Sequence, residues 1–291
     1  MRRRLDASPL PDTVKGLRSA SIGLLKRFTW RAMRFPLGFK LAQLVSEEWA
    51  QAAHFAAIKR SAARLDETLD LSVQRGPFAG MTYHDYAAVG STLYPKLLGS
   101  YERELHQTVE DIVRLGYETV VDIGAAEGYY AVGLAMRMPG AKVIAFEMHP
   151  AGQTAIRAMA TRNGVSDRVR VLGIATRSEL AALDVSGRVL VISDCEGAEY
   201  ELLESDSVPW RRDADLLIEV HQFHGIDGRA ELGRRFRATH DIEPIDVRRR
   251  DSSFYPELSA LLPADRDAVL FERTDYNGWL WCSSRRNAAR V

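Results

Sequence analysis

Cysteine is scarce in this sequence, which holds only Cys195 and Cys282, far apart in the chain. Two isolated cysteines exclude a disulfide framework and lack the spacing of a structural zinc site. No apolar run approaches the roughly 18 residues that a membrane-spanning helix needs. The basic start of the chain is not followed by the uninterrupted apolar stretch of a cleaved signal peptide. We therefore expect a reducing compartment, the cytoplasm.

The chain has no net charge, because its 39 Lys and Arg residues balance 39 Asp and Glu residues. The distribution is uneven: residues 1–40 hold ten basic residues against two acids, Asp6 and Asp12. This basic arm predicts contact with an anionic membrane surface, an acidic partner or the acidic remainder of the chain. Nucleic acid is not an expected partner, because the aromatic residues of the arm have helical spacing. No feature of the sequence indicates an oligomeric state.

The residue pattern divides the chain into three parts. Residues 1–75 form a basic region of helical periodicity, with a second helical stretch over 41–69. Gly76, Pro77 and Gly80 then mark a loop. Residues 76–115 form a leading segment that we expect to act as a lid, and residues 116–291 form the main domain.

The main domain alternates short β-branched runs with longer helical stretches. Five such runs are 119–123, 142–146, 169–172, 189–192 and 215–220. Apolar strands separated by helices are typical of βαβ units in a parallel sheet that is buried on both faces. Two further candidates, 242–247 and 279–282, lack a convincing crossover helix, which favours an antiparallel final pair. The predicted fold is α/β: a doubly wound seven-stranded sheet with its last strand antiparallel, preceded by the helical N-terminal region.

A glycine-containing loop follows the first predicted strand. Gly124 and Gly128 let the backbone bend sharply and let a ligand approach main-chain atoms. A dinucleotide site needs Gly-x-Gly-x-x-Gly, and here Ala125 stands in place of the middle glycine. Asp122 and Glu127 add two carboxylates, which would repel a pyrophosphate. The loop therefore favours a cationic ligand without phosphate.

The Asp-x-Gly-x-x-x-Gly pattern of 122–128 resembles the first motif of class I S-adenosylmethionine-dependent methyltransferases. The resemblance implies S-adenosylmethionine as the cofactor, with Asp122 organising the turn and facing the methionine end. At the end of the second predicted strand, Glu147 matches the acid that binds both ribose hydroxyls in that family. The residues that the resemblance assigns to the cofactor are Asp122, Gly124, Ala125, Glu127, Gly128, Glu147 and Asp194.

A second segment, Ile192–Leu203, resembles the Asp-x-Glu-Gly-x-Glu motif of the FkbM-type branch of these methyltransferases. The resemblance implies methylation of a hydroxyl group on a sugar, a glycolipid or a secondary metabolite. The chain departs from the branch at Ile192, where lysine is frequent. It also lacks the acid that often holds the adenine amino group after the third strand, where Thr176 is the candidate substitute.

The ends of the fourth and fifth predicted strands carry the candidate catalytic residues Asp194, Glu219 and His221. Strand alternation places Glu219 and His221 on one face, at the edge where α/β sheets bind ligands. His221 is the natural general base for a hydroxyl, and Glu219 is a candidate partner that orients it. The alternative is a divalent metal ion held by Asp194 and His221, which would lower the hydroxyl pKa.

In the leading segment, Tyr101 and Glu102 are candidate lid or cofactor contacts, against ordinary packing of an amphipathic helix. Purely structural roles also compete elsewhere: Glu196 and Glu199 would favour a helix start electrostatically, and His221 would be a satisfied buried histidine. Two other functions remain as alternatives. A nicotinamide-dependent oxidoreductase is disfavoured by the missing middle glycine, and a non-catalytic methyltransferase-like binding module by the intact acids of the motifs.

Overall fold

The computed structural model describes residues 57–61, 64–85, 88, 92–204, 208–221, 227–272 and 278–288. The chain divides into two units, Met1–Arg60 and Ser61–Val291, and the sheet belongs to the second. The expected N-terminal region, residues 1–75, overlaps this second unit at its end. The basic arm and most of the expected helical stretch over 41–69 lie outside the described residues, although 57–61 and 64–68 are helical. No helix that the structure describes is both long and apolar enough to cross a membrane.

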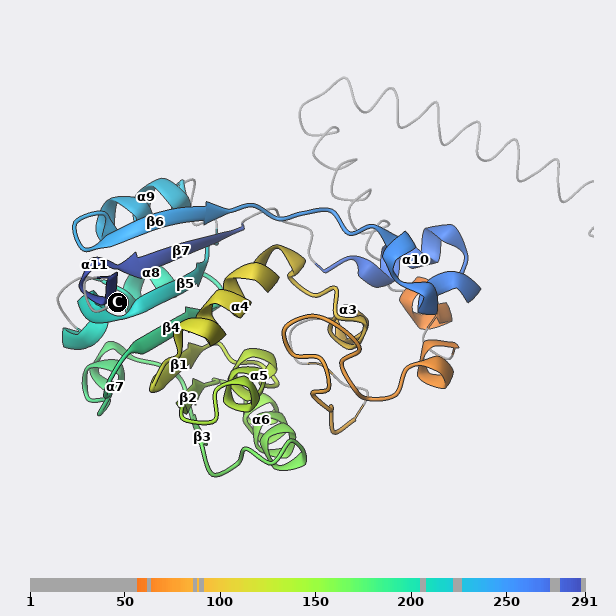
Figure 1. Ribbon diagram of the computed structural model, residues 1–291, viewed down its shortest axis with the longest axis horizontal. Helices are drawn as coiled ribbons and strands as arrows, with labels where there is room; N and C mark the ends of the chain where they lie inside the picture. The colour runs from red at the N-terminus through yellow and green to blue at the C-terminus, as the bar shows by residue number, and fades with distance from the viewer. Residues whose placement is uncertain are drawn as a thin grey trace, which may run out of the picture. The chain divides into compact units, whose positions relative to one another are not determined.

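A seven-stranded sheet forms the centre of the second unit, in the order β3-β2-β1-β4-β5-β7-β6 (Figure 1). The first five strands run parallel, whereas β7 lies antiparallel between β5 and β6. This arrangement confirms the predicted fold class, including the reversed last strand. The strands are β1 Thr119–Ile123, β2 Lys142–Phe146, β3 Val169–Leu172, β4 Val189–Ser193, β5 Asp215–Glu219, β6 His240–Ile245 and β7 Trp279–Ser284.

Helices connect the parallel strands, as their crossovers require. Helices α5 and α6 pack at the β1–β3 end of the sheet, and α9 packs on β6 (Figure 1). The α-helices are α3 Leu93–Leu98, α4 His106–Leu115, α5 Tyr129–Arg137, α6 Pro150–Arg162, α7 Arg177–Ala181, α8 Glu199–Leu202, α9 Gly228–Phe236, α10 Pro263–Leu270 and α11 Arg285–Ala288. The 3-10 helices are η1 Arg103–Leu105, η2 Pro209–Asp213, η3 Ser252–Phe254 and η4 Pro256–Ala260.

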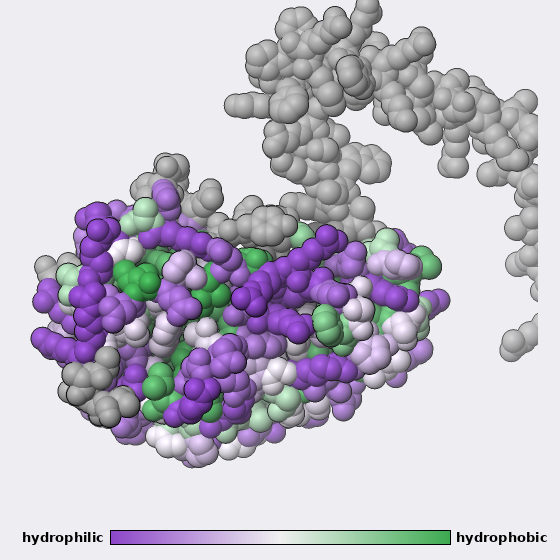
Figure 2. Space-filling model, turned by 45° about the horizontal axis from the view of Figure 1, so that its top comes forward, coloured by the Kyte–Doolittle hydropathy of each residue, from purple (hydrophilic) through white to green (hydrophobic). Residues whose placement is uncertain are grey.

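The strands β1, β4 and β5 are buried along their whole length, which explains their continuous apolar runs. Val121 and Ile123 belong to a core cluster with Leu202, Leu232 and Phe236 of α8 and α9. Asp122 alternates to the opposite face, which α5 covers. On the face seen in Figure 2, the described residues are mainly hydrophilic, with apolar side chains in separate groups between them.

The leading segment packs against the connection between β6 and β7. Helix α3 contacts α10 (Figure 1), and Arg75 pairs with Glu257 at 2.6 Å. Arg250 pairs with Glu104 at 2.7 Å and with Glu272 at 2.7 Å, and both acids are buried. These contacts bring residues 64–85 and 92–105 together with residues 250–272, where they can form one wall of a site.

Candidate active site

A pocket of about 770 Å³ lies at the carboxyl ends of the parallel strands. The strand order reverses between β1 and its neighbours β2 and β4, and α/β sheets bind their ligands at such a point. The lining residues come from every loop after the parallel strands, from the leading segment and from the connection between β6 and β7. They include Asp122–Ala126, Phe146–His149, Ile174–Arg177, Asp194–Glu196, Glu219, His221, Lys96, Tyr101, Tyr130 and Glu272.

The loop after β1 depends on residues with a left-handed backbone. Gly124 has φ +86°, and Ala126 has φ +50°. The backbone N–H groups of Gly124 and Ala125 both donate to the carbonyl oxygen of Phe146 at 3.0 Å, so the loop lies against the end of β2. Gly124 and Ala125 line the pocket as expected, whereas Gly128 does not. Gly128, with φ +99°, is the N-cap residue of α5.

Asp122 contributes a buried carboxylate to the pocket. Its Oδ2 atom has no hydrogen-bond partner among the described residues. Burial raises the pKa of Asp122 to about 7, and the charge of Asp194 adds to the shift. A buried carboxylate oxygen without a donor is costly, and a cationic ligand in the pocket would offset that cost. The residue therefore fits the cationic ligand that its position predicts.

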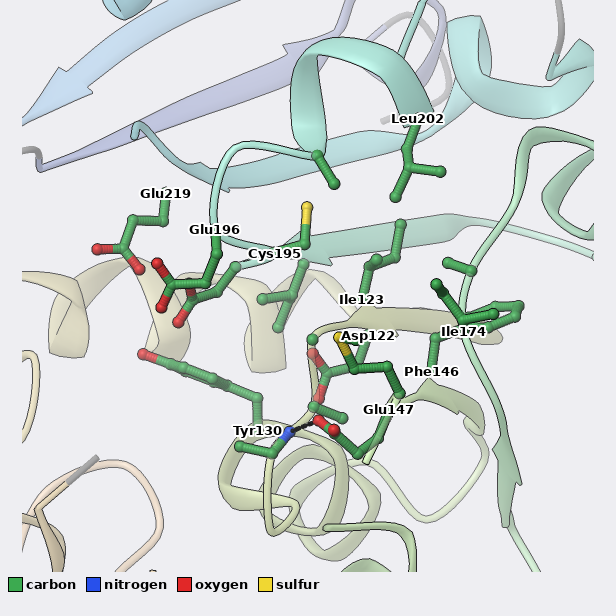
Figure 3. Close-up of a pocket in the computed structure, with 18 of the residues that line it drawn as sticks. Asp122, Ile123, Tyr130, Phe146, Glu147, Ile174, Cys195, Glu196, Leu202 and Glu219 are labelled. Carbon is green, nitrogen blue, oxygen red and sulfur yellow. Dashed lines mark hydrogen bonds between the residues drawn. The ribbon is translucent and has the colours of Figure 1, made fainter. Parts of the chain in front are cut away.

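Glu147 is held rigidly at the end of β2. Its Oε2 atom accepts the backbone N–H of Ala126 at 2.9 Å (Figure 3), and its Oε1 atom accepts that of His149 at 2.7 Å. Each carboxylate oxygen has further acceptor capacity. The glycine at position 152 keeps space for this side chain, because a Cβ there would lie 2.6 Å from Glu147 Cγ. The carboxylate is thus preorganised to accept two more hydrogen bonds from a ligand.

One end of the pocket is apolar. Met148 and Ile174 leave 60% and 61% of their surface exposed, which is unusual for large apolar side chains beside a cavity. Leu202 and Phe146 also line the pocket. Thr176 also lines the pocket, but its Oγ1 atom caps α7 by accepting the Glu179 N–H at 3.2 Å. The hydroxyl of Thr176 is therefore already used within the chain.

The opposite end of the pocket is acidic. His221 Nε2 lies 3.6 Å from Asp194 Oδ1 and 3.9 Å from Glu219 Oε2. Glu196 Oε2 is 3.5 Å from the same nitrogen, and Figure 3 shows Glu196 and Glu219 pointing into one space. The structure therefore brings together the three predicted catalytic residues. Among the described residues, Asp194, Glu219 and His221 also offer ligand atoms within 4.8 Å of one another, as a candidate metal site does.

A fourth acid, Glu199, contacts the His221 ring. Its Oε1 atom lies 3.2 Å from His221 Nδ1, whereas Glu219 faces the other ring nitrogen. The expectation that Glu219 orients the ring is therefore wrong. Burial alone would lower the pKa of His221, but the hydrogen bond to Glu199 and the surrounding carboxylates raise it. The sequence analysis assigned Glu199 only to a helix start, although it is the last acid of the Asp-x-Glu-Gly-x-Glu motif.

Glu127 does not line the pocket, contrary to expectation. It is fully buried in an ion pair with Lys96 of α3, and its Oε1 also accepts from Tyr83 at 3.3 Å. Lys96 itself lines the pocket and lies over the ring of Tyr101 at 4.7 Å. Two residues of the 122–128 motif therefore do not line the pocket. Glu127 anchors the leading segment through Lys96, and Gly128 forms the turn at which α5 begins.

Tyr101 lines the pocket, as the sequence analysis expected, and its ring meets Tyr129 edge-on at 5.1 Å. Glu102 is buried behind it with φ +45° and accepts from Tyr130 Oη. Glu272 receives the Glu102 backbone N–H at 3.0 Å, and burial raises its pKa to about 7 despite Arg250. Tyr130 and Glu272 are pocket residues that the sequence analysis missed, because no motif marks either of them.

No family model matches the chain. It is similar to the release factor glutamine methyltransferase of Chlorobaculum tepidum, with 31% identity over 107 residues. The match covers 36% of this chain and spans about a third (33%) of the length of that curated relative.

Three solved structures illustrate the structural similarity. An O-methyltransferase from Bacillus cereus in complex with SAH has 12% identity and TM-score 0.43, over 60% of this chain and 78% of that one. The precorrin-6y C5,15-methyltransferase from Geobacter metallireducens has 19% identity and TM-score 0.39, over 48% and 76%. The O-methyltransferase TomG from Streptomyces achromogenes, in complex with SAM, has 11% identity and TM-score 0.41, over 59% and 75%.

The sheet order, the reversed β7 and the pocket at the switch point define the class of fold. The chain has the Rossmann-like α/β fold of class I S-adenosylmethionine-dependent methyltransferases. A fold hosts many activities, so the function must come from the site itself.

Proposed function

We propose that the protein transfers a methyl group from S-adenosylmethionine to a hydroxyl oxygen of a sugar, a glycolipid or a secondary metabolite. The observation that carries the proposal is that Asp122 lines the pocket while its buried Oδ2 atom has no hydrogen-bond partner among the described residues. The same pocket is also lined by Glu147 and by the acidic group around His221. A cationic cofactor and a neutral acceptor suit this distribution of charge.

The residues of the cofactor end fit S-adenosylmethionine. Each carboxylate oxygen of Glu147 accepts one backbone N–H, from Ala126 or from His149, and can accept one more hydrogen bond. Glu147 would use this remaining capacity to accept hydrogen bonds from the two ribose hydroxyls. Met148 and Ile174 would cover the adenine, which needs apolar surface. Asp122 would face the positively charged methionine end. When bound there, the cofactor supplies an electrophilic methyl group on its sulfonium.

The acceptor end would belong to His221 and its neighbours. The Nε2 atom of His221 would take the proton of the acceptor hydroxyl, because a neutral imidazole is a good base near neutral pH. Asp194 and Glu219 would stabilise the imidazolium that results, at 3.6 Å and 3.9 Å from Nε2. Tyr130 and Tyr101 would supply aromatic walls against which the acceptor is aligned.

The motif Asp194-Cys-Glu-Gly-Ala-Glu199 supports the FkbM-type branch and, with it, hydroxyl acceptors. The curated relative modifies a glutamine by its name. The Pro-Pro-Tyr-like motif after the fourth strand that amine methyltransferases carry is absent from this sequence. This difference favours oxygen over nitrogen as the methyl acceptor.

A divalent metal ion is the alternative means of activating the hydroxyl. Ligand atoms of Asp194, Glu219 and His221 within 4.8 Å of one another favour it, since carboxylate and imidazole together suit Mn²⁺, Zn²⁺ or Fe²⁺. Such an ion would lower the pKa of a bound hydroxyl. Chelation distinguishes this version from direct proton transfer to His221.

The test is a mass-spectrometric screen for methyl transfer from labelled S-adenosylmethionine to hydroxylated metabolites and glycans. His221→Ala should lower turnover by about 10²–10⁴ while S-adenosylhomocysteine still binds with nearly unchanged affinity. If activity survives a chelator and is not raised by added metal, His221 acts as the base without a metal ion. Activity restored by one metal supports the metal version.

Two results would contradict the proposal. Calorimetry that shows NAD binding, and none for S-adenosylhomocysteine, would indicate an oxidoreductase. Near-normal turnover in both Asp194→Ala and His221→Ala would remove this pair from the mechanism.

A further inference from the structure

Glu199, the first residue of α8, is fully buried beside the candidate active site. Its Oε1 atom lies 3.2 Å from His221 Nδ1 and accepts the His221 backbone N–H at 3.1 Å. Its Oε2 atom accepts the Gly197 N–H at 2.9 Å and lies 3.5 Å from Cys195 Sγ. One carboxylate thus connects the turn after β4 to His221, which lies two residues after the end of β5.

The turn before α8 is built to deliver this carboxylate. Glu196 and Gly197 both have a left-handed backbone, with φ +53° and +97°. Such a conformation is disfavoured for a residue other than glycine, and positions of this kind cluster at functional sites. The turn directs the Gly197 N–H back onto the Glu199 side chain, which fixes the carboxylate before it meets His221.

The hydrogen bond determines where a neutral His221 carries its proton. Both carboxylate oxygens of Glu199 act as acceptors for backbone N–H groups, Oε1 for that of His221 at 3.1 Å and Oε2 for that of Gly197 at 2.9 Å. An ionised carboxylate only accepts hydrogen bonds, so the proton of a neutral ring must be on Nδ1. The lone pair then belongs to Nε2, which faces Asp194 and Glu219 in the pocket.

We propose that Glu199 is a positioning residue, which holds the His221 ring in the tautomer and orientation that present Nε2 to the acceptor hydroxyl. The catalytic part of this inference rests on the proposed function. The tautomer of His221 does not, because it is a property of the folded chain. Glu219 and Glu196 cannot replace Glu199, because both face Nε2 and neither contacts Nδ1. In other enzymes, a carboxylate that accepts from one ring nitrogen likewise fixes the orientation of a catalytic or metal-bound histidine.

The first measurement reads the tautomer without turnover. The full chain, labelled with ¹⁵N-histidine and saturated with S-adenosylhomocysteine in a chelator, is examined by long-range ¹H–¹⁵N NMR at about pH 9, where the rings are neutral. The signal missing from His221→Ala assigns the residue. We expect the proton on Nδ1. A proton on Nε2 in the unmodified chain overturns the proposal without any variant.

The second measurement compares two substitutions. Glu199→Gln keeps an oxygen that can accept from Nδ1, whereas Glu199→Leu has similar volume and no acceptor. Glu199→Gln should keep the Nδ1 tautomer, and Glu199→Leu should populate both tautomers. With an acceptor from the screen, kcat should fall by about 10- to 100-fold in Glu199→Leu and less in Glu199→Gln. The KM for the acceptor should change by less than about threefold in both.

Tyr200→Phe is the matched control for a purely structural role. Tyr200 Oη donates to the His221 carbonyl oxygen at 2.6 Å and does not line the pocket. Its loss loosens the His221 backbone but leaves the Glu199 contact, so the tautomer and kcat should stay as in the unmodified chain. Equal effects of Tyr200→Phe and Glu199→Leu overturn the proposal. If no variant or parent transfers methyl groups, the proposed function fails, and the NMR spectra still decide the role of Glu199.

Discussion

A Cβ atom on Gly124 would lie 1.7 Å from the carbonyl oxygen of Asp194. The loops after β1 and β4 are therefore in direct backbone contact, and the Asp194 N–H also donates to the Ile123 carbonyl at 3.0 Å. This contact fixes the distance between the cofactor end and the acidic end of the pocket. Only glycine satisfies both the contact and the φ of +86° at position 124.

Gly124→Ala should destabilise the fold by more than about 1 kcal/mol and abolish the thermal shift that S-adenosylhomocysteine produces. The reason is that the new methyl group must push the loops after β1 and β4 apart. Urea unfolding and melting curves measure both effects. Gly140→Ala is the control, because a Cβ there meets nothing within 4 Å; equal losses in the two variants would contradict this reading.

Glu147→Ala should weaken S-adenosylhomocysteine binding by about 1.5–3 kcal/mol, the usual contribution of hydrogen bonds to a charged group. Isothermal calorimetry measures the affinity. The free protein should also melt at a lower temperature, because the Ala126 and His149 N–H groups lose their acceptor. The exposed Glu243 of β6 offers the control, and Glu243→Ala should bind with unchanged affinity. Unchanged affinity in Glu147→Ala would remove Glu147 from the cofactor site.

Binding of S-adenosylmethionine should release a proton near neutral pH. The pKa of Asp122 is raised to about 7, first by burial and then by the charge of Asp194. A bound sulfonium favours the ionised carboxylate and lowers this pKa, so affinity should rise as the pH rises through 7. Calorimetry in two buffers of different ionisation enthalpy counts the released protons.

S-adenosylhomocysteine, which lacks the sulfonium charge, should release fewer protons than S-adenosylmethionine. Asp122→Asn should reduce the dependence on the buffer, and any remainder should come from Glu272, whose pKa is also raised to about 7. A binding enthalpy that is the same in both buffers for the unmodified chain at pH 7 would contradict this prediction. All samples contain a chelator, so that metal binding cannot contribute protons.

Lys96→Met should destabilise the fold by about 3–5 kcal/mol, because it leaves the fully buried Glu127 without its cation. The double variant Lys96→Met/Glu127→Gln should recover a large part of this loss, since no uncompensated charge remains. Urea unfolding measures both. Arg285, paired with Asp241 on the surface, offers the control: Arg285→Met should cost less than about 1 kcal/mol. No recovery in the double variant would contradict the prediction.

The sequence predicted the sheet correctly, and it placed Asp122, Gly124 and Glu147 at one edge of it, because both follow local rules. Buried parallel strands appear as short apolar runs, and Asp122, Gly124 and Glu147 stand at strand ends that always meet at one edge of such a sheet. The reversed β7 was also predictable, because the sequence before it lacks a convincing crossover pattern; helix α10, which lies between β6 and β7, packs on α3. The order of the strands along the chain is therefore enough to place Asp122, Gly124 and Glu147 at the same edge of the sheet.

The tertiary structure decided which acids face the ligand. Four acids, Asp194, Glu196, Glu199 and Glu219, surround one histidine, and spacing alone does not show which of them reaches Nδ1. The left-handed turn at Glu196 and Gly197 makes that choice. Likewise, Glu127 does not line the pocket but pairs in the core with Lys96, a lysine 31 residues earlier in the sequence. A buried charge pairs with whichever opposite charge the packing of the fold brings next to it, and the spacing of residues in the sequence does not show which residue that is.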